Sequence, residues 1–195
     1  FFDYLNKNIF APHEVKDFYF SWDGALSDRV CALYMGVFGT DDIVPDDGIR
    51  SGSFKLTDNY ESGGAGLVST VNAYSVFIDA LSSGGVSTNG ERILNEETVN
   101  LFTREYTQGQ MRKDFQMTGK TEYGYGLGVR VLTDKEASKS PLGEFGWDGA
   151  AGAYALVDTV NHISIFYAQH VMGFPRVYSE IHPRIRDLAY EAMGF

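Results

Sequence analysis

The sequence has a single cysteine, no long apolar run and little positive charge, and each shortage limits what the chain can be. Its one cysteine, Cys31, excludes an internal disulfide and a metal centre built on several thiolates. No apolar segment approaches the roughly 18–20 residues that span a bilayer, so no transmembrane segment is predicted. Lysine and arginine number 16 against 26 aspartates and glutamates, a net charge of −10. This balance argues against binding to nucleic acid and against adsorption to anionic membranes.

What is present is typical of a folded globular protein. Of the 195 residues, 44% are hydrophobic and 22% are charged, which suits one domain with a real core. Internal repeats and low-complexity segments are absent. The chain begins Phe1-Phe2-Asp3, without an initiator Met or a signal-peptide pattern. We therefore expect a mature product or a fragment, with residues 1–195 forming a single domain.

Helices are predicted where apolar residues recur at helical spacing. The clearest runs from Val71 to Ser82, with Ser69-Thr70 at its N-cap and Gly84-Gly85 after its end. Others are expected over Phe2 to Phe10, from Asn95 to about Arg104, and after Pro183, where the apolar stripe is Ile185, Leu188, Ala189, Ala192 and Met193. Residues 105–122 show no such period and are predicted to form a mobile excursion.

Three short strands are predicted close together near the C-terminus, from aromatic and β-branched residues. They cover Glu144–Trp147, Ala153–Asp158 and Ile163–Gln169, and Asp158 and Asn161 favour a turn before the third. Earlier segments predict a strand over Leu127–Leu132, a short strand over Arg29–Met35 and a surface loop over Asp41–Ser53. Helices followed by an antiparallel meander and a last helix indicate an α+β fold, with helices packed on an antiparallel sheet.

Several short motifs resemble functional sites, but a structural interpretation fits each of them better. Thr118-Gly119-Lys120-Thr121 contains the Gly-Lys-Thr of a phosphate-binding loop, but the further glycine needed five residues before Gly119 is Asp114. The preceding strand and following helix are also not predicted, so we interpret this segment as a flexible loop. The acidic pairs Asp41-Asp42 and Asp46-Asp47 do not have calcium-loop spacing and suggest a solvated surface. The histidines are scattered without zinc-binding spacing, at positions 13, 162, 170 and 182. Cys31 lies between Val30 and Ala32 and is expected to be a buried small hydrophobe.

A serine nucleophile is not visible in the sequence. Gly-x-Ser-x-Gly is absent, and no serine is followed by lysine three residues later. The remaining candidate is Trp147-Asp148-Gly149 at the end of a predicted strand. From the residues alone, this segment is more simply a core aromatic followed by a turn.

Four segments taken in order resemble the C-terminal half of the serine β-lactamase-like superfamily, which includes class C β-lactamases, penicillin-binding D-alanyl-D-alanine carboxypeptidases and related esterases. They are YLNKNIFAPHEVKDFYF (4–20), GGAGLVSTVNAYSVFIDALSSGG (63–85), ILNEETVNLF (93–102), and YGYGLGV (123–129) with FGWDGAAGAYALVD (145–158). The match covers nearly the whole chain and keeps the order of the family. It implies the C-terminal part of a β-lactamase/transpeptidase-like fold, with no metal or organic cofactor.

By this resemblance, Trp147-Asp148-Gly149 stands at the strand motif that is Lys-Thr-Gly, His-Thr-Gly or Trp-x-Gly in family members. Trp147 would then line the acyl pocket, Gly149 would keep the strand edge open, and the backbone N–H of Ala150 would be one of two oxyanion donors. The missing cation at position 147 disfavours binding of a β-lactam or peptide carboxylate, and favours ester hydrolysis or no catalysis at all. The negative charge of Asp148 also disfavours β-lactams.

The nucleophile motif Ser-x-x-Lys and the motif Tyr-x-Asn lie upstream of this segment in the family. We therefore expect a piece of a longer serine hydrolase, inactive alone, whose parent acts on a small ester, amide or peptide-like substrate. An unpaired sheet edge would favour association between copies. Resemblance alone suggests an extracytoplasmic or periplasmic location.

Two alternatives stay open at this point. One is a non-catalytic binding or regulatory protein that keeps the fold, with which Trp147-Asp148-Gly149 is compatible. The other is a true β-lactamase or carboxypeptidase, whose intact parent would be acylated by penicillins.

Overall fold

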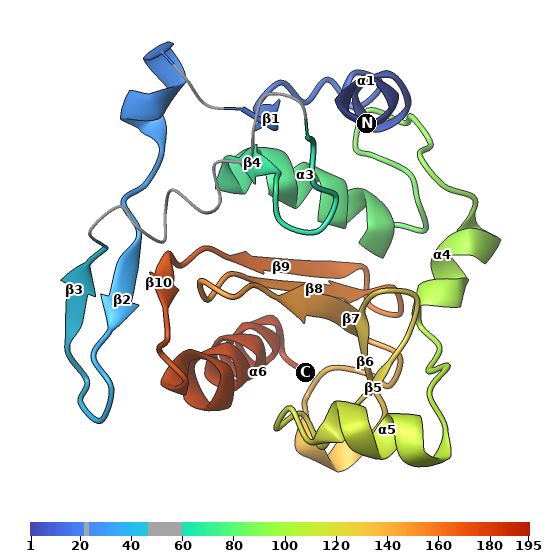
Figure 1. The fold of residues 1–195 in the computed structure, drawn as a ribbon. Helices are drawn as coiled ribbons and strands as arrows, with labels where there is room; N and C mark the ends of the chain where they lie inside the picture. The colour runs from blue at the N-terminus through green and yellow to red at the C-terminus, as the bar shows by residue number, and fades with distance from the viewer. Residues whose placement is uncertain (22–23, 47–59) are drawn as a thin grey trace.

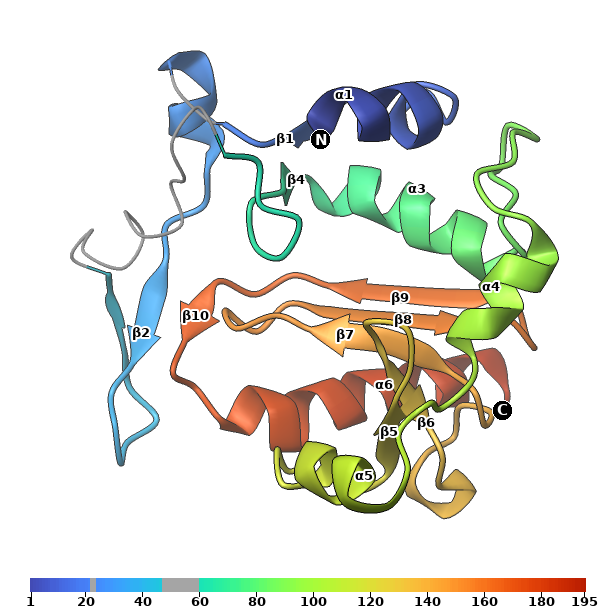
Figure 2. The same cartoon turned by 45° about the vertical axis from the view of Figure 1, so that its right-hand side comes forward.

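A computed structural model describes residues 1–21, 24–46 and 60–195. At its centre is a five-stranded antiparallel sheet in the order β5-β6-β7-β8-β9. Helix α3 (Val71–Ser82) covers one face, and α6 (His182–Met193) covers the other (Figures 1 and 2). The strands are β5 (Tyr123–Tyr125), β6 (Arg130–Leu132), β7 (Phe145–Asp148), β8 (Tyr154–Asp158) and β9 (Ile163–Tyr167). The expected α+β arrangement of helices on an antiparallel sheet is confirmed.

The meander of β7, β8 and β9 follows the predicted strands to within two residues at each end. The turn before β9 forms as expected. Asp158 Oδ1 accepts hydrogen bonds from the backbone N–H groups of Val160 (2.8 Å) and Asn161 (3.0 Å). This arrangement lets a short acidic side chain replace the backbone partners that a tight turn cannot supply.

Helix α3 has the predicted bounds, and the Thr70 hydroxyl caps it by accepting from the N–H of Ala73 at 3.2 Å. The second predicted helix is shorter than expected, since α4 spans Glu96–Phe102. At the start of the chain, α1 (Phe2–Leu5) continues into a π-helical segment, η1 (Asn6–Phe10). Both views place α3 between α1 and the central sheet (Figures 1 and 2).

Three predictions about the rest of the chain are wrong. The excursion over residues 105–122 contains a helix, α5 (Gly109–Gln116), held by contact of Phe115 with Tyr125 at a ring separation of 5.3 Å. The strand expected over Arg29–Met35 begins only at Tyr34, because the 3-10 helix η2 (Gly24–Arg29) precedes it. Cys31, between these two elements, is exposed rather than buried.

Two small sheets flank the central one. β1 (Phe18–Tyr19) pairs with β4 (Val68–Ser69), and β2 (Tyr34–Gly36) lies between β3 (Ile43–Pro45) and β10 (Val171–Met172). The pairing of β10 with β2 is parallel and joins distant parts of the chain. β3 therefore replaces part of the predicted surface loop, whose remaining residues 47–53 lie outside the described residues.

Helix α6 follows η4 (Val177–Ile181) and has Pro183 in its first turn, as expected. Its buried residues, however, are His182, Arg186 and Tyr190. Two members of the predicted apolar stripe, Leu188 and Met193, are 44% and 48% exposed. The helix therefore packs on the sheet with a polar face, and the stripe prediction is wrong. Among the described residues, no helix is both long and apolar enough to cross a membrane.

Candidate functional site

The corner between β7 and β8, residues 148–152, is held almost entirely through its carbonyl groups. The Tyr178 hydroxyl lies 2.9 Å from the Gly149 oxygen and 3.0 Å from the Ala150 oxygen. The backbone N–H of Val171 donates to the oxygen of Ala151 at 2.9 Å. His182 Nε2 lies 2.9 Å from the Gly152 oxygen. All four carbonyls from Gly149 to Gly152 thus have partners.

The amide groups of the corner differ from its carbonyls. The N–H of Gly149 donates to the oxygen of Ala153 (2.8 Å), and that of Gly152 donates to Gly149 (2.9 Å). Within the described part of the chain, the N–H groups of Ala150 and Ala151 have no hydrogen-bond partner. Ala150 is exposed, so its amide does not incur the cost of a buried, unpaired donor. The corner therefore presents two adjacent amide donors that the described residues leave unpaired.

Two glycines allow the corner to pack against its own chain. A Cβ at Gly146 would lie 1.9 Å from the Ala155 oxygen, so β7 and β8 could not approach as they do. Gly152 has a φ of +88°, and a Cβ there would lie 2.6 Å from Gln169 Nε2. Gly149 is different, because a Cβ there would be in ordinary contact with Ala153 at 3.5 Å.

Trp147 forms an aromatic wall beside the corner. Its ring lies 5.7 Å from that of Tyr125 and 6.5 Å from that of Phe115, so strand β5 and helix α5 both contribute to the wall. Trp147 remains 44% exposed. Its side chain points to the same face of β7 as Phe145, which packs into the core under α3. The wall is apolar and accessible.

Asp148 points to the opposite face, toward α6. Its carboxylate is 4% exposed and is ion-paired with Lys120. Arg130 Nη1 lies 3.9 Å and His182 Nδ1 3.2 Å from Asp148 Oδ1. Burial by itself would raise the pKa of this carboxyl, but the His182 hydrogen bond and the charges of Arg130 and Lys120 lower it well below its usual value. The negative charge expected to face a substrate is therefore neutralised beneath the strand.

Arg130 is the centre of a buried polar layer between the sheet and α6. Its guanidinium is 1% exposed, lies 3.3 Å from Glu144 Oε1 and donates to the Ala155 oxygen at 3.1 Å. The rings of Tyr123 and Tyr154 lie 5.1 and 4.6 Å from its Cζ atom. Burial raises the pKa of Glu144, and the charge of Arg130 opposes that rise. Hydrogen bonds and cation–π contacts thus satisfy a charge that would otherwise be costly to bury.

Of the other candidates, only His182 and Lys120 join this site in the described residues. Lys120, expected to lie in a flexible loop, reaches Asp148, while His13, His162 and His170 have no contact with the corner in the described residues. Throughout residues 1–21, 24–46 and 60–195, no cluster of three His, Cys, Asp or Glu side chains could hold a metal ion. Sequence reasoning missed Lys120, Tyr178 and His182, because contacts between distant segments have no local signature.

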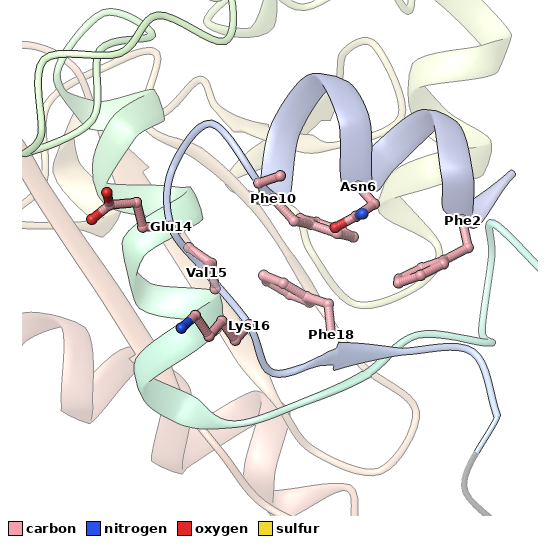
Figure 3. A pocket seen from close by; sticks show the side chains of 8 residues that line it. Phe2, Asn6, Phe10, Glu14, Val15, Lys16 and Phe18 are labelled. Carbon is pink, nitrogen blue, oxygen red and sulfur yellow. The ribbon is translucent and has the colours of Figure 1, made fainter.

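A separate hollow of about 610 Å³ lies at the N-terminal helix (Figure 3). Phe2, Asn6 and Phe10 line it from the helix, and Phe18 lines it from the returning segment. Phe10 and Phe18 stack there with ring centroids 4.0 Å apart. None of the corner residues lines this hollow, and α3 stands between α1 and the sheet (Figures 1 and 2).

Comparison with known proteins agrees with the architecture. A family model described as Beta-lactamase matches residues 1–190. Among solved structures, the simvastatin synthase LovD from Aspergillus terreus (LovD6 mutant) is similar with a TM-score of 0.78 at 15% identity, over 97% of this chain and 50% of that one. EstCE1, described as a hydrolase with promiscuous acyltransferase activity, is similar with a TM-score of 0.74 at 22% identity, over 96% of this chain and 50% of that one.

A penicillin-binding protein homolog from Caulobacter crescentus gives a TM-score of 0.63 at 19% identity, over 97% of this chain and 52% of that one. At these identities the likenesses establish the fold alone. The chain spans about half the length of the structures it matches. A search of curated proteins finds no match.

Proposed function

The chain belongs to the Beta-lactamase family. From this premise we propose that it supplies an oxyanion-hole donor and the wall of the substrate pocket in a serine hydrolase or acyltransferase. The observation that carries the proposal is the pair of amides at Ala150 and Ala151, which no described residue pairs with, beside an open aromatic wall at Trp147. The nucleophile and its base would come from a further segment of a longer protein, since no Ser-x-x-Lys occurs in these 195 residues.

In this proposal the base takes the proton of the serine hydroxyl as the serine oxygen attacks the carbonyl carbon of an ester, and the carbonyl π electrons move to oxygen. The Ala150 N–H, with a second donor, stabilises the resulting oxyanion. One such donor is worth about 2.7–4 kcal/mol in a hydrolase of known mechanism. Collapse of the intermediate expels the alcohol, which takes a proton from the base, and leaves an acyl-enzyme. Water or another alcohol then removes the acyl group.

The substrate side is assigned to Trp147, Asp148 and Gly149. The rings of Trp147, Tyr125 and Phe115 suit an apolar acyl group. The nearby cation, Lys120, is engaged by Asp148, so it offers little to a substrate carboxylate. Asp148 acts by anchoring the strand end, and Gly149 contributes backbone. A neutral ester therefore fits this side better than a penicillin or a peptide carboxylate.

Intact mass spectrometry tests the proposal. The chain alone, incubated with a nitrophenyl ester or a penicillin, is expected to form no adduct and give no turnover. A longer protein that carries Ser-x-x-Lys and Tyr-x-Asn is expected to hydrolyse the ester and leave the penicillin largely untouched. A stoichiometric adduct on this chain would overturn the proposal by revealing a nucleophile within it. A longer protein without either motif would instead establish a non-catalytic module.

We also propose that isolated copies of this chain associate through β9. In the described residues β9 pairs only with β8, and its segment ISIFY carries no charge that would oppose pairing of edges. Sedimentation velocity over a hundredfold concentration range is expected to show a dimer at the upper end. A monomer at every concentration would contradict this.

A further inference from the structure

Tyr178, on the segment that leads into α6, contacts the corner from beneath. Its hydroxyl is shared between two consecutive carbonyl oxygens, at 2.9 Å from Gly149 and 3.0 Å from Ala150. Its ring packs edge-on against His182, with centroids 5.5 Å apart. One side chain thus holds two neighbouring peptide groups at once.

Peptide geometry links these carbonyls to the Ala150 and Ala151 N–H groups. In a trans peptide the C=O of one residue and the N–H of the next lie in one plane and point in opposite directions. The Gly149 carbonyl shares its plane with the N–H of Ala150, and the Ala150 carbonyl shares its plane with the N–H of Ala151. Drawing both oxygens toward Tyr178 therefore directs both N–H groups away from it.

We propose that Tyr178 is the positioning residue for the Ala150 oxyanion donor and for the adjacent Ala151 amide, and this inference rests on the proposed function of the corner. The tyrosine touches no reacting atom. It fixes the orientation of the two peptide planes before substrate arrives, so that the donors need no reorganisation during the reaction.

His182 secures the far end of the same corner. Its Nε2 faces the Gly152 oxygen at 2.9 Å, and its Nδ1 faces Asp148 Oδ1 at 3.2 Å. The ring also packs in a tilted orientation against that of Tyr154, with centroids 4.7 Å apart. The two ends of residues 148–152 are therefore tied to one side chain. Between them, Tyr178 contacts both the Gly149 and the Ala150 oxygens, the first of which also accepts from the N–H of Gly152 at 2.9 Å.

Tyr178→Phe tests the inference in this chain, because it removes the hydroxyl and keeps the ring. Nitrogen-15 relaxation would report the order of the Ala150 and Ala151 amides. In the wild type we expect order parameters of about 0.85, typical of rigid backbone, and in the variant values below about 0.6. The matched control is Tyr167→Phe, whose ring also contacts His182 but whose hydroxyl donates to Gln169 instead of to the corner.

Unchanged order at both amides in Tyr178→Phe would overturn the inference, as would an equal loss in Tyr167→Phe. Far-ultraviolet circular dichroism and thermal melts check that both variants remain folded. If Tyr178→Phe does not fold, Tyr178→His takes its place, because its smaller polar ring also lacks the hydroxyl. Rigid Ala150 and Ala151 amides in that variant would contradict a positioning role for the hydroxyl.

Kinetics of a longer, active protein provide a second readout. Tyr178→Phe is expected to lower kcat about tenfold with KM unchanged, because misaligned donors affect the transition state more than substrate binding. A rise in KM alone would assign Tyr178 to binding and contradict positioning. If no form of the protein turns over substrate, the proposed function fails, while the relaxation result still decides whether Tyr178 orients the amides.

Discussion

The face of the central sheet toward α3 is packed with aliphatic and aromatic side chains, whereas the face toward α6 adds buried charged and hydroxyl groups to an apolar cluster around Leu156. Ile78, Val99 and Phe145 belong to the first layer. Arg130 and Glu144 lie in the second and are equally buried. The apolar layer needs only complementary shape, but the polar layer needs every partner in place. The corner is held from the polar face, where hydrogen bonds give it direction.

The largest expected effect comes from breaking the polar layer. Arg130→Met should lower the free energy of unfolding by about 4 kcal/mol, because it leaves Glu144 buried without its cation. Urea denaturation would measure the loss. The double variant Arg130→Met/Glu144→Leu should recover most of it, since both charges are gone. A double variant less stable than the single one would show that the pair itself is stabilising.

Truncating a side chain in the apolar layer should lower the free energy of unfolding by somewhat less. Ile78→Ala removes a side chain that is 2% exposed and should cost about 3 kcal/mol. Ile78→Val, which removes one methylene group, should cost about 1 kcal/mol in the same denaturation experiment. Both losses should be the same at pH 5 and pH 8, because no charge is involved. A pH-dependent loss would mean that the two layers are coupled.

Removing a single hydrogen bond from the polar layer should lower the free energy of unfolding by a smaller amount still. Tyr190 is fully buried, and its hydroxyl donates to Asp158 Oδ2 at 2.7 Å. Tyr190→Phe should cost about 2 kcal/mol, the usual range for a hydrogen bond to a charged group. Tyr106→Phe is the control, since that side chain is 45% exposed and should change stability by less than about 0.5 kcal/mol. Equal effects would contradict the role of the bond.

His13 shows the cost of a buried polar group without partners. It is 6% exposed, and in the described residues neither ring nitrogen has a hydrogen bond. His13→Leu should raise the free energy of unfolding by about 1 kcal/mol at neutral pH. The control His170→Leu should give no gain, because His170 Nδ1 lies 3.0 Å from the Cys31 oxygen and its side chain is exposed.

The same residue predicts a pH dependence. Burial lowers the pKa of His13 below 6.5, and the charge of Glu91 opposes the shift only in part. Below about pH 6.5 the unfolded chain therefore binds a proton that the folded chain resists, and stability falls as the pH falls. Thermal melts from pH 7.5 to pH 5 should show a shallower decline in His13→Leu. Parallel declines would assign the effect to another group.

Sequence reasoning could predict the apolar layer and the meander, because their signals are local. Thr70 at the N-cap and the apolar face of α3 predict that helix, and Asp158 predicts its turn. The family resemblance predicted the place of Trp147 and Ala150 in the chain. Their roles at the site stay proposals.

The polar layer could not be predicted in this way. In the sequence, Arg186 and Tyr190 lie outside the apolar stripe of the last helix, which predicts a solvent-facing position. They are core residues because α6 packs against the sheet, where Arg186 contacts Tyr123 and Tyr190 contacts Asp158. Helix α5 was missed for a similar reason. Its sequence is polar, and the helix is stabilised by the contact of Phe115 with the aromatic wall.

The parallel pairing of β2 with β10 has a consequence for the order in which the protein folds. The hairpins β7–β8 and β8–β9 close over short loops, and such hairpins form within microseconds. β2 meets β10 only after most of the intervening chain has been positioned, and the entropy of closing so long a loop delays that contact. During synthesis, Tyr34 to Gly36 leave the ribosome long before Val171 and Met172 exist. Until then β2 has only β3 beside it, and its other edge is free to pair with another chain.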